Sequence, residues 1–501
     1  MKAIILALFI NIIYTQIWIN SFTAGNYDYN NQFMGGSEIL QLETHKDKLF
    51  ASVSYWQDES NIWYGGNNSN LGWAQIIRLD NPNGVWSVDL DLDSYYLRPE
   101  ILKEIIFTKD FNGNLLDNPD TLLIVGAYSS NFTFGPVISS AFVRDDNSGN
   151  WNQTIIYEGD LPAGESYSIR DMELYTDQVT GNEHLLISVG TKGIFSGSYN
   201  PNIEGRIQWN VEPEFGPFNI RSLGITIANN SLYFSSGNKI YVRNDGETPT
   251  YSIIHDFSDL SSNINSAVGG IRGLTSIDNP NTNDESLLLM WCPDGQSKGT
   301  VFRLDSNISG GFDREYEIKL SLLVEDYLPG VTVNYVLGAY NEFLKVNDYT
   351  ENEFYHLVGF EATIQGGNYP SWNGYYSGGL FALRNDNAEY QLEEINGAIS
   401  FEDSPLVATR CYAKSPFANE NAIYFGGFDP NGFLATNKAW IYKKIITLSG
   451  DINYDGNVNI LDVMQVVNLI LSDGYDENAD LNEDGFVNIL DVVQIVTIIL
   501  S

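Results

Sequence analysis

Short apolar runs that alternate with polar positions fill most of the chain. Between about residue 35 and residue 445, each run is a few residues long and ends at Asn, Asp, Gly or Pro, and no long helical period interrupts them. Alternation with a period of two, bounded by turn residues, is typical of β-strands. The pattern therefore predicts a mainly β body.

The strand runs recur along the chain as a repeat. Ile169-Arg170, Ile220-Arg221 and Ile271-Arg272 open three copies, and their arginines stand 51 residues apart twice in succession. The other copies open at Glu38, Lys103, Thr332 and Thr409-Arg410. Seven units of about 50 to 80 residues, with four strands each, favour a seven-bladed β-propeller. A pair of β-sandwiches is the alternative, and the regular arginine spacing argues against it.

The N-terminal segment has the pattern of an export signal. Lys2 precedes the apolar run Ala3–Ile10, which resumes after Asn11. This run has the length of a signal-peptide core rather than of a membrane span. We expect a signal peptide over residues 1–24, a propeller over residues 25–446 and a secreted protein without a membrane span. An anchor retained through Ile19 is the alternative.

The C-terminal segment contains two calcium-loop patterns. Residues 451–462 place oxygen side chains at loop positions 1, 3, 5, 9 and 12 and Gly456 at position 6, and the pattern repeats 29 residues later. Hard oxygen ligands at this spacing enclose a calcium ion. The expected ligands, with a backbone carbonyl from the seventh position of each loop, are Asp451, Asn453, Asp455, Asn457, Asn459 and Asp462, then Asp480, Asn482, Asp484, Phe486, Asn488 and Asp491.

Each loop continues directly into an apolar helical pattern, over residues 460–471 and 489–500, and no helix precedes either loop. Residues 449–501 therefore resemble a dockerin, a small α-helical domain of two tandem F-hands. The resemblance implies two calcium ions, folding coupled to calcium, and docking onto a cohesin domain, often on a scaffold for polysaccharide degradation. Where that family often has Ser or Thr, this chain has Ile460-Leu461 and Ile489-Leu490. The implied partner is a cohesin-like protein with a more apolar surface, or the chain's own propeller.

Acidic residues greatly outnumber basic residues, with 64 Asp and Glu against 26 Lys and Arg. The net charge is −38, and the last 51 residues hold ten carboxylates and no Lys or Arg. Binding to nucleic acid requires a basic surface, so this charge argues against a nucleic-acid partner.

The repeat also predicts where a ligand binds. Inner strands of a propeller begin beside the channel mouth, and five of the seven aligned starting residues are basic: Lys103, Arg170, Arg221, Arg272 and Arg410. Guanidinium groups bind carboxylate or sulfate bidentately, which favours an anionic polysaccharide. Aromatic residues for stacking against sugars occur in the loops of blades one and six, at Trp56, Trp63, Trp73, Trp372 and Tyr375. The alternatives are arginines that tie blades together through residues such as Asp171, and aromatics that pack the loops onto the propeller.

Catalytic motifs are weak. None of the four histidines lies in a nucleophile or metal motif, and we expect His184 and His356 to be packed in strands. Glu361 and Asp58 are the candidate carboxylates.

Cys292 and Cys411 are expected to be two buried thiols, with a disulfide as the alternative. The sequence thus favours a secreted protein that binds a polysaccharide, with cleavage by a glycoside hydrolase or lyase left open. A non-catalytic adhesion or scaffold protein is the alternative.

Overall fold

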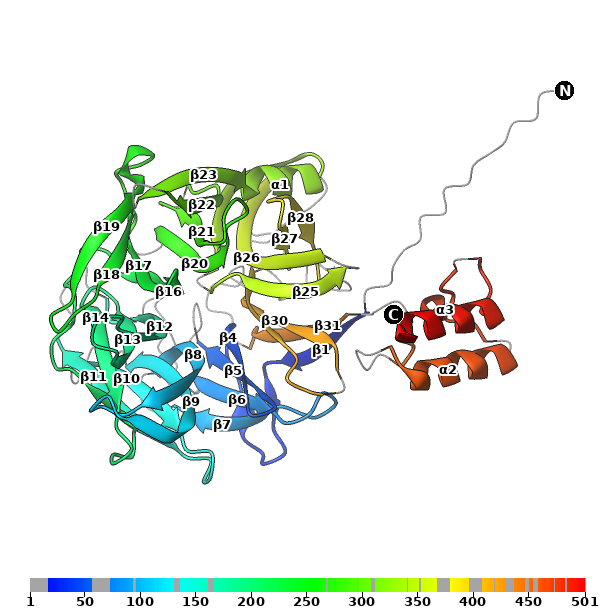
Figure 1. Ribbon diagram of the computed structural model, residues 1–501, viewed down its shortest axis with the longest axis horizontal. Helices are drawn as coiled ribbons and strands as arrows, with labels where there is room; N and C mark the ends of the chain where they lie inside the picture. The colour runs from blue at the N-terminus through cyan, green and yellow to red at the C-terminus, as the bar shows by residue number, and fades with distance from the viewer. Residues whose placement is uncertain are drawn as a thin grey trace.

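The computed structural model describes most of the chain (Figure 1). The described residues are 17–55, 73–92, 96–129, 136–160, 166–266, 269–294, 296–307, 311–339, 341–350, 353–366, 379–395, 408–418, 420–428, 437–446, 450–453, 458–472, 474–482 and 484–500.

The described strands form seven antiparallel blades around a central axis, which confirms the predicted propeller (Figure 1). Blade one consists of β4 (Glu38–His45), β5 (Lys48–Ser54), β6 (Gln75–Leu79) and β7 (Ser87–Asp91). Blade two consists of β8 (Tyr96–Lys109), β9 (Leu115–Ser129), β10 (Val137–Arg144) and β11 (Trp151–Gly159). Blade three consists of β12 (Ile169–Thr176), β13 (Glu183–Val189), β14 (Gly193–Tyr199) and β15 (Ile207–Trp209).

Blades four and five are β16 (Ser222–Ala228), β17 (Ser231–Ser236), β18 (Lys239–Asn244) and β19 (Thr250–Asp256), then β20 (Gly270–Asp278), β21 (Glu285–Cys292), β22 (Thr300–Ser306) and β23 (Phe312–Lys319). Blade six contains β24 (Val331–Gly338), β25 (Leu344–Thr350), β26 (Glu353–Gly366), β27 (Phe381–Asn385) and β28 (Tyr390–Glu393). Its inner strand is divided, because β24 and β25 pair with successive parts of β26. Outside the blades are β2 (Asn26–Tyr27), β3 (Phe33–Met34), η2 (Phe257–Asp259) and α1 (Leu320–Tyr327).

The seventh blade joins the two ends of the propeller sequence. It consists of β29 (Ala408–Lys414), β30 (Ala422–Phe428), β31 (Trp440–Ile445) and, as its outermost strand, β1 (Ile17–Thr23). Strand β1 pairs antiparallel with β31 from Ile17 opposite Ile445 to Thr23 opposite Trp440. The propeller therefore begins at least eight residues before the boundary expected at residue 25, and residues 17–23 contribute a strand to it.

Seven hydrophobic clusters of described residues form the core, and each lies between two neighbouring blades. The cluster between blades seven and one contains Ile39 and Leu49 of blade one, Tyr424 and Ile441 of blade seven, and Phe22 of β1. Apolar side chains on both faces of each sheet are thus buried against the next blade, and the ring closes without an exposed face.

Arginines on the third strands of several blades tie neighbouring blades together. Arg144 contacts Asp89 of blade one at 2.8 Å, and Arg243 contacts Asp177 of blade three at 2.7 Å. Arg384 of blade six contacts Glu317 of blade five at 2.7 Å. These arginines, near the outside of the blades, therefore have the structural role of joining neighbouring blades, which the sequence left open as an alternative.

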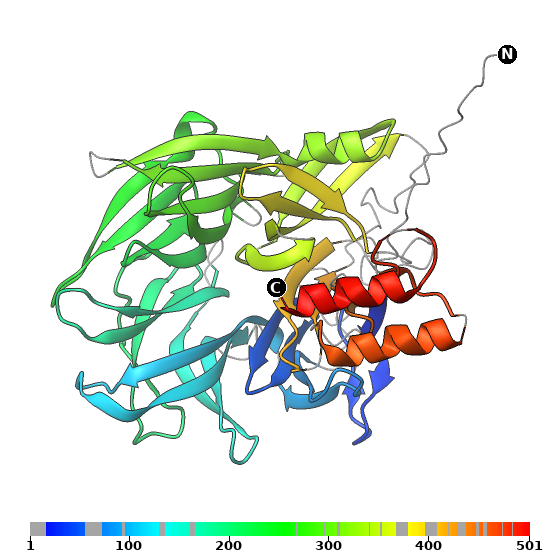
Figure 2. The same ribbon diagram turned by 45° about the vertical axis from the view of Figure 1, so that its right-hand side comes forward.

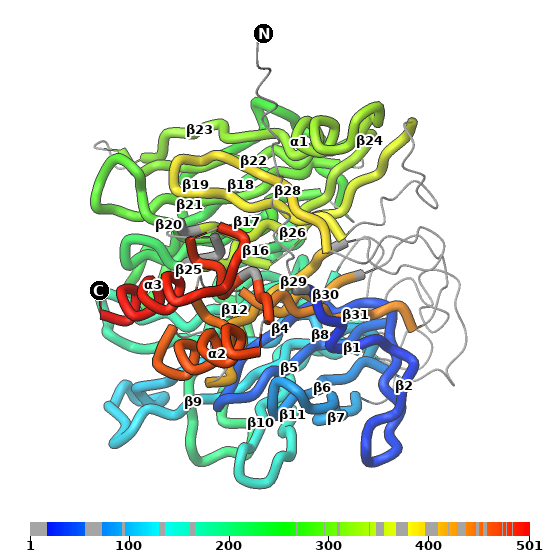
Figure 3. The backbone as a smooth tube through the Cα atoms, turned by 90° about the vertical axis from the view of Figure 1, so that its right-hand side faces the viewer, coloured from blue at the N-terminus to red at the C-terminus, as the bar shows by residue number. Residues whose placement is uncertain are grey.

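The C-terminal segment forms a separate small core outside the ring, beyond β1 and β31 (Figures 1, 2 and 3). It contains α2 (Ile460–Leu471), η4 (Glu477–Ala479) and α3 (Ile489–Leu500). Ile452, Val466, Ala479 and Ile495 are buried among residues of this segment alone. Within the described residues, no helix has the length and apolar character needed to cross a membrane.

Candidate functional site

Arginines and glutamates from the inner strands, together with Glu361 of the second strand of blade six, converge at the centre of the propeller. All five arginines and the three glutamates among them are at least nine-tenths buried. We call this set the central cluster: Arg98, Arg170, Arg221, Arg272, Arg410, Glu38, Glu100, Glu361 and Tyr128. The four arginines and Glu38, which the repeat aligned, thus share one site with Glu100 and Glu361, which it did not place there.

Three glutamates lie between the arginines. Glu38 contacts Arg98 at 3.0 Å and Arg410 at 3.3 Å, and its Oε2 accepts a hydrogen bond of 2.8 Å from Ser54. Glu100 contacts Arg170 at 3.2 Å and Arg98 at 3.5 Å. The ring is therefore an alternating network of ion pairs, whereas the sequence predicted basic residues at five of the seven starting positions.

Arg410 contacts two of these glutamates at once. Its Nε lies 3.3 Å from Glu38 Oε1, and its Nη2 lies 3.2 Å from Glu361 Oε2. Burial raises the pKa of Glu361 above its ordinary value, and Arg410 and Arg272 offset only part of this effect. Burial acts in the same sense on Glu38, but Arg98, Arg410 and the Ser54 hydroxyl hold its pKa below the ordinary value. Two carboxylates on one guanidinium thus have pKa values that are shifted in opposite directions.

Tyr128 adds a phenol to the central cluster. Burial and the neighbouring charge of Glu100 raise its pKa to about 12, although Arg98, Arg170 and Arg221 act against this. The phenol is therefore protonated at neutral pH and is a hydrogen-bond donor.

The divided inner strand of blade six reaches across the channel beside the central cluster. Asn341 Nδ2 donates a hydrogen bond of 2.6 Å to Gln41 Oε1 of blade one. Gln41 Nε2 in turn donates to the carbonyl of Glu100 in blade two, at 3.4 Å. Asn341 thus connects blade six with blade one, which is not its neighbour in the ring.

Lys103, predicted to belong to the ring, occupies a different level of the channel. It pairs with Glu173 of blade three and lies 3.8 Å from Glu342 of blade six. Burial raises the pKa of Glu43 and of Asp171 to about 8 in its neighbourhood, with Lys103 acting in the opposite sense on both. Among the described residues Asp171 pairs with no arginine, whereas the alternative of a blade-to-blade tie would require such a pair. Its carboxylate instead accepts hydrogen bonds from the backbone N–H groups of Met172 and of Ile225 in blade four.

Arg98 holds the ring position in blade two that the alignment gave to Lys103. The register of β8 against β9 shifts around Pro99, so an alignment by spacing misses this position. A local signal was present, because Leu97-Arg98 repeats the aliphatic–arginine pair of Ile169-Arg170 and Ile271-Arg272. Thr332 is also misplaced: it lies in β24 opposite Gln365, whereas the carbonyl of Gly338, at the end of β24, accepts a hydrogen bond from Arg272 of the central cluster.

Most predicted sugar-stacking residues, namely Trp56, Trp63, Trp372 and Tyr375, lie outside the described residues, as does Asp58. Trp73 is described and half-buried. His356 is buried as expected, and burial with the nearby Arg384 lowers its pKa to about 4. His184 is half-buried, and burial lowers its pKa too. Cys292 and Cys411 are free, buried thiols, which confirms the prediction.

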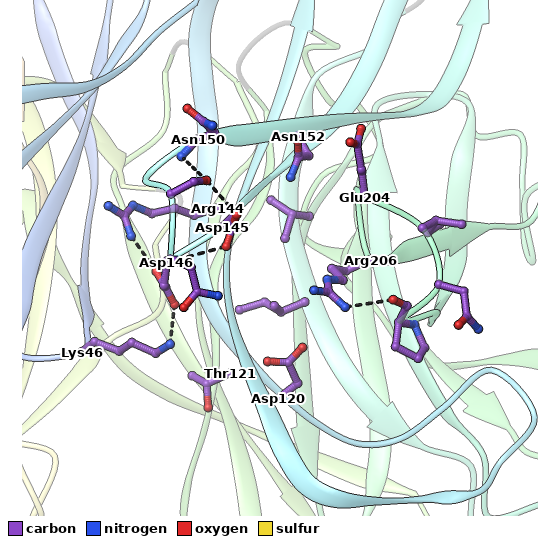
Figure 4. Close-up of a pocket in the computed structure, with 17 residues that line it drawn as sticks. Lys46, Asp120, Thr121, Arg144, Asp145, Asp146, Asn150, Asn152, Glu204 and Arg206 are labelled. Carbon is purple, nitrogen blue, oxygen red and sulfur yellow. Dashed lines mark hydrogen bonds and ion pairs between the residues drawn. The ribbon is translucent and has the colours of Figure 1, made fainter.

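A polar groove lies between the turns of the first three blades, away from the central cluster (Figure 4). Its volume is about 550 Å³, and Lys46, Asp120, Arg144, Glu204 and Arg206 are part of its lining. Asp146 at its edge already contacts Lys46 at 2.5 Å and Arg144 at 2.6 Å. No aromatic side chain contributes to its lining.

The calcium-loop residues are arranged to hold their loops closed. Asp462 Oδ1 accepts the N–H of Ile452 at 2.9 Å, and Asp491 Oδ1 accepts that of Asn482 at 3.2 Å. Gly485 at loop position 6 has φ of +83°, which a side chain would strain. Asp455 and Asn457 lie outside the described residues.

Four carboxylates of this segment, Asp451, Asp462, Asp480 and Asp491, are buried, and the last 51 residues have no Lys or Arg to neutralise them. Buried negative charge of this kind requires a cation. The described His, Cys, Asp and Glu side chains do not form a metal cluster by themselves, and calcium loops also draw on amide and backbone oxygens. The donor set fits calcium.

Both C-terminal helices expose an apolar stripe to solvent. On α2 it consists of Ile460, Leu461, Met464, Val467 and Leu471, and on α3 of Ile489, Leu490, Val493, Val496 and Leu500. The two sets are related by the same 29-residue offset as the loops. The propeller leaves this stripe uncovered, because these side chains remain exposed in the full chain.

Residues 449–500 match the family model of the dockerin type I domain. The fold and this match define a seven-bladed β-propeller protein that carries a C-terminal dockerin type I domain. Domains of this type bind calcium and dock onto cohesin domains, and proteins that carry them are typically extracellular or attached to the cell surface. No curated protein has a significantly matching sequence.

Several solved propeller structures resemble the chain weakly. The α-L-arabinofuranosidase Arb93A from Fusarium graminearum is 9% identical with a TM-score of 0.38, over 85% of this chain and 96% of that chain. The α-L-arabinanase of Penicillium chrysogenum is 10% identical with a TM-score of 0.35, over 86% and 98%. NanB sialidase from Streptococcus pneumoniae is 12% identical with a TM-score of 0.35, over 76% and 70%. Likeness at this level assigns no activity to this chain.

Proposed function

We propose that the chain is a secreted carbohydrate-active protein whose central cluster binds and hydrolyses a polysaccharide. The observation that carries this proposal is the pair Glu38 and Glu361, which contact one guanidinium and have oppositely shifted pKa values. Pairs of carboxylates whose environments separate their pKa values are suited to divide the roles of acid and base. The C-terminal dockerin supports a polysaccharide as the substrate class, because the family often serves polysaccharide degradation.

In this proposal Glu361 donates its proton to the glycosidic oxygen as that bond breaks. Glu38, which is ionised, acts on the opposite side of the sugar ring, either on water or on the anomeric carbon. Arg98, Arg170, Arg221 and Arg272 bind hydroxyl or carboxylate groups of the sugar. Water supplies the hydroxyl group that completes the hydrolysis.

Release of reducing ends from a panel of neutral and acidic polysaccharides tests the proposal. Glu361→Gln should lower kcat by about 100-fold or more, because it removes the acid while it keeps the side-chain shape. Glu317→Gln is the matched control, since Glu317 is a buried glutamate paired with Arg384 far from the central cluster. The control should lose stability but keep the kcat of the folded protein.

A non-catalytic binding protein is the second candidate. Each glutamate of the central cluster contacts at least one arginine, an arrangement that also suits a structural ion-pair network. If the wild-type protein releases no reducing ends from any polymer and Glu361→Gln changes only the melting temperature, this second function replaces the first.

In the same proposal, the dockerin binds two calcium ions and attaches the protein to a cohesin-like partner. The exposed apolar stripe supports a partner surface that is more apolar than one contacting Ser or Thr. Attachment to the chain's own propeller is the weaker alternative, because the stripe is exposed in the full chain.

A further inference from the structure

A concave surface lies at the outer part of blade five, beside α1 and the end of blade four. Its volume is about 630 Å³, and its apolar lining comes from Leu260, Trp291, Phe302, Tyr316 and Leu322. Pockets of this size that are lined by aromatic and aliphatic groups, with a few polar groups at the edge, are typical of ligand sites. We call this surface the blade-five groove.

Aromatic rings in the blade-five groove are held in place by their neighbours. Trp291 Nε1 donates a hydrogen bond of 3.0 Å to Asn238 Oδ1, and its ring stacks on the buried Phe257 with centroids 6.3 Å apart. Tyr316 lies edge-to-face with Phe302 at 6.1 Å and remains 54% exposed. The groove thus presents flat apolar faces that lose little conformational entropy when a ligand binds.

One cation at the edge of the groove is available to a ligand. Arg314 is engaged by both carboxylate oxygens of Asp259, at 2.9 and 2.6 Å. Lys319 is exposed and forms no ion pair within the described part of the chain. A hydroxyl or carboxylate group of a ligand can therefore pair with Lys319.

The strand register connects the groove with the central cluster. Ile271, Trp291, Thr300 and Lys319 are successive partners across the four strands of blade five. Ile271 precedes Arg272 of the central cluster. Because neighbouring strands lie about 4.8 Å apart, Lys319 is about 14 Å outward from the inner strand at the same end of the blade.

We propose that the blade-five groove is a second binding site for the same polysaccharide, outside the central cluster. It binds a distant stretch of the polymer by stacking sugar rings on Tyr316 and Trp291, while Lys319 contacts a hydroxyl or carboxylate group. This inference rests on the proposed function, because it takes the same ligand class. It adds a site that favours long chains over short oligosaccharides.

Affinity electrophoresis on gels that contain single soluble polysaccharides, first polygalacturonate and xylan, measures polymer binding. Tyr316→Ala should weaken binding about tenfold, and Lys319→Ala should weaken it mainly for the acidic polymer. Tyr27→Ala is the matched control, because Tyr27 is 63% exposed and also lies edge-to-face with a phenylalanine. Its affinity should equal that of the wild type.

The variant Glu361→Gln distinguishes binding by the blade-five groove from hydrolysis at the central cluster. Glu361→Gln should still bind the polymer, and adding Tyr316→Ala should weaken its binding about tenfold. Cleavage of a short oligosaccharide should be the same with and without Tyr316. The groove would not be a glycan site if Tyr316→Ala bound the polymers with unchanged affinity. The same conclusion would follow if this variant lost affinity for a protein but for no glycan. A wild-type protein that binds but does not cleave would overturn only the proposed hydrolysis.

Discussion

Arg410 stabilises the ionised forms of two glutamates at the propeller centre, because its guanidinium contacts Glu38 and Glu361 together. The same residue type has a different task on the third strands, where Arg144 and Arg384 tie neighbouring blades. The difference is one of position along the radius of the propeller. An arginine on an inner strand faces side chains from several blades, whereas one on a third strand faces only the next blade.

The pH dependence of cleavage should follow from the two pKa shifts. Glu361 must be protonated and its pKa is raised, so kcat/KM should fall as pH increases through that pKa. Glu38 must be ionised and its pKa is lowered, so the acidic limb should lie below the ordinary value of a glutamate. Kinetics across the pH range with Glu361→Gln should show loss of the basic limb. A basic limb that persists in this variant would assign the acid to another group.

Replacement of Arg410 should destabilise the fold in a pH-dependent way. Arg410→Met leaves Glu38 and Glu361 buried with less compensation, which should cost about 3 kcal/mol or more at neutral pH. The pKa values of both glutamates rise in the variant, so stability is lost as pH increases through them and returns when both are protonated. Thermal melts at acidic and neutral pH measure this. Arg314→Met, which removes an exposed pair with Asp259, should cost at most about 1 kcal/mol.

Strand β1 links the start of the described chain to its last blade. Phe22 joins the core between blades seven and one, and Trp18 packs against Phe381 and Phe425 at 6.0 and 5.1 Å. The Ala24 N–H also donates to the carbonyl of Ala439 at 3.0 Å. Cleavage of the predicted export signal after Ala24 would therefore remove this strand from the propeller.

Two truncated proteins test the contribution of β1. A chain that starts at Ile17 should keep the stability of the propeller. A chain that starts at Gly25 should lose about 3 kcal/mol or more, since it removes Phe22 from the core and exposes the edge of β31. Calorimetry compares the two melting temperatures, and size-exclusion chromatography reports aggregation through the exposed edge. Equal melting temperatures would show that β1 is dispensable.

At the scale of the whole molecule, two cores are stabilised by different forces. The propeller is held by apolar clusters between blades, whereas the C-terminal segment has one small core around Val466 and Ile495 and four buried carboxylates. Without a cation these carboxylates repel one another. Calcium is therefore expected to determine the stability of one core only.

Removal of calcium should unfold residues 450–500 and leave the propeller folded. A chelator should abolish the helical far-UV circular dichroism of α2 and α3, and added calcium should restore it while magnesium should not. The melting transition of the propeller is the internal control and should stay constant. A parallel shift of both transitions would show that the two cores unfold together.

The sequence by itself determined the features that depend on local spacing. Seven strand repeats, two calcium loops and two apolar helices each have a pattern within a few tens of residues, because period and turn chemistry are local properties. The recurrence of Arg170, Arg221 and Arg272 located part of the central cluster in the same way. Leu97-Arg98 carried the same signal but had a different spacing.

Only the tertiary structure decided which charges share the channel and where the ring closes. Glu100 and Glu361 follow no repeat pattern, and they meet Glu38 because strands of blades one, two and six face one axis. Strand β1 pairs with β31 across more than 400 residues of sequence. Contacts between distant segments depend on how the blades pack around the axis, and no local pattern encodes that arrangement.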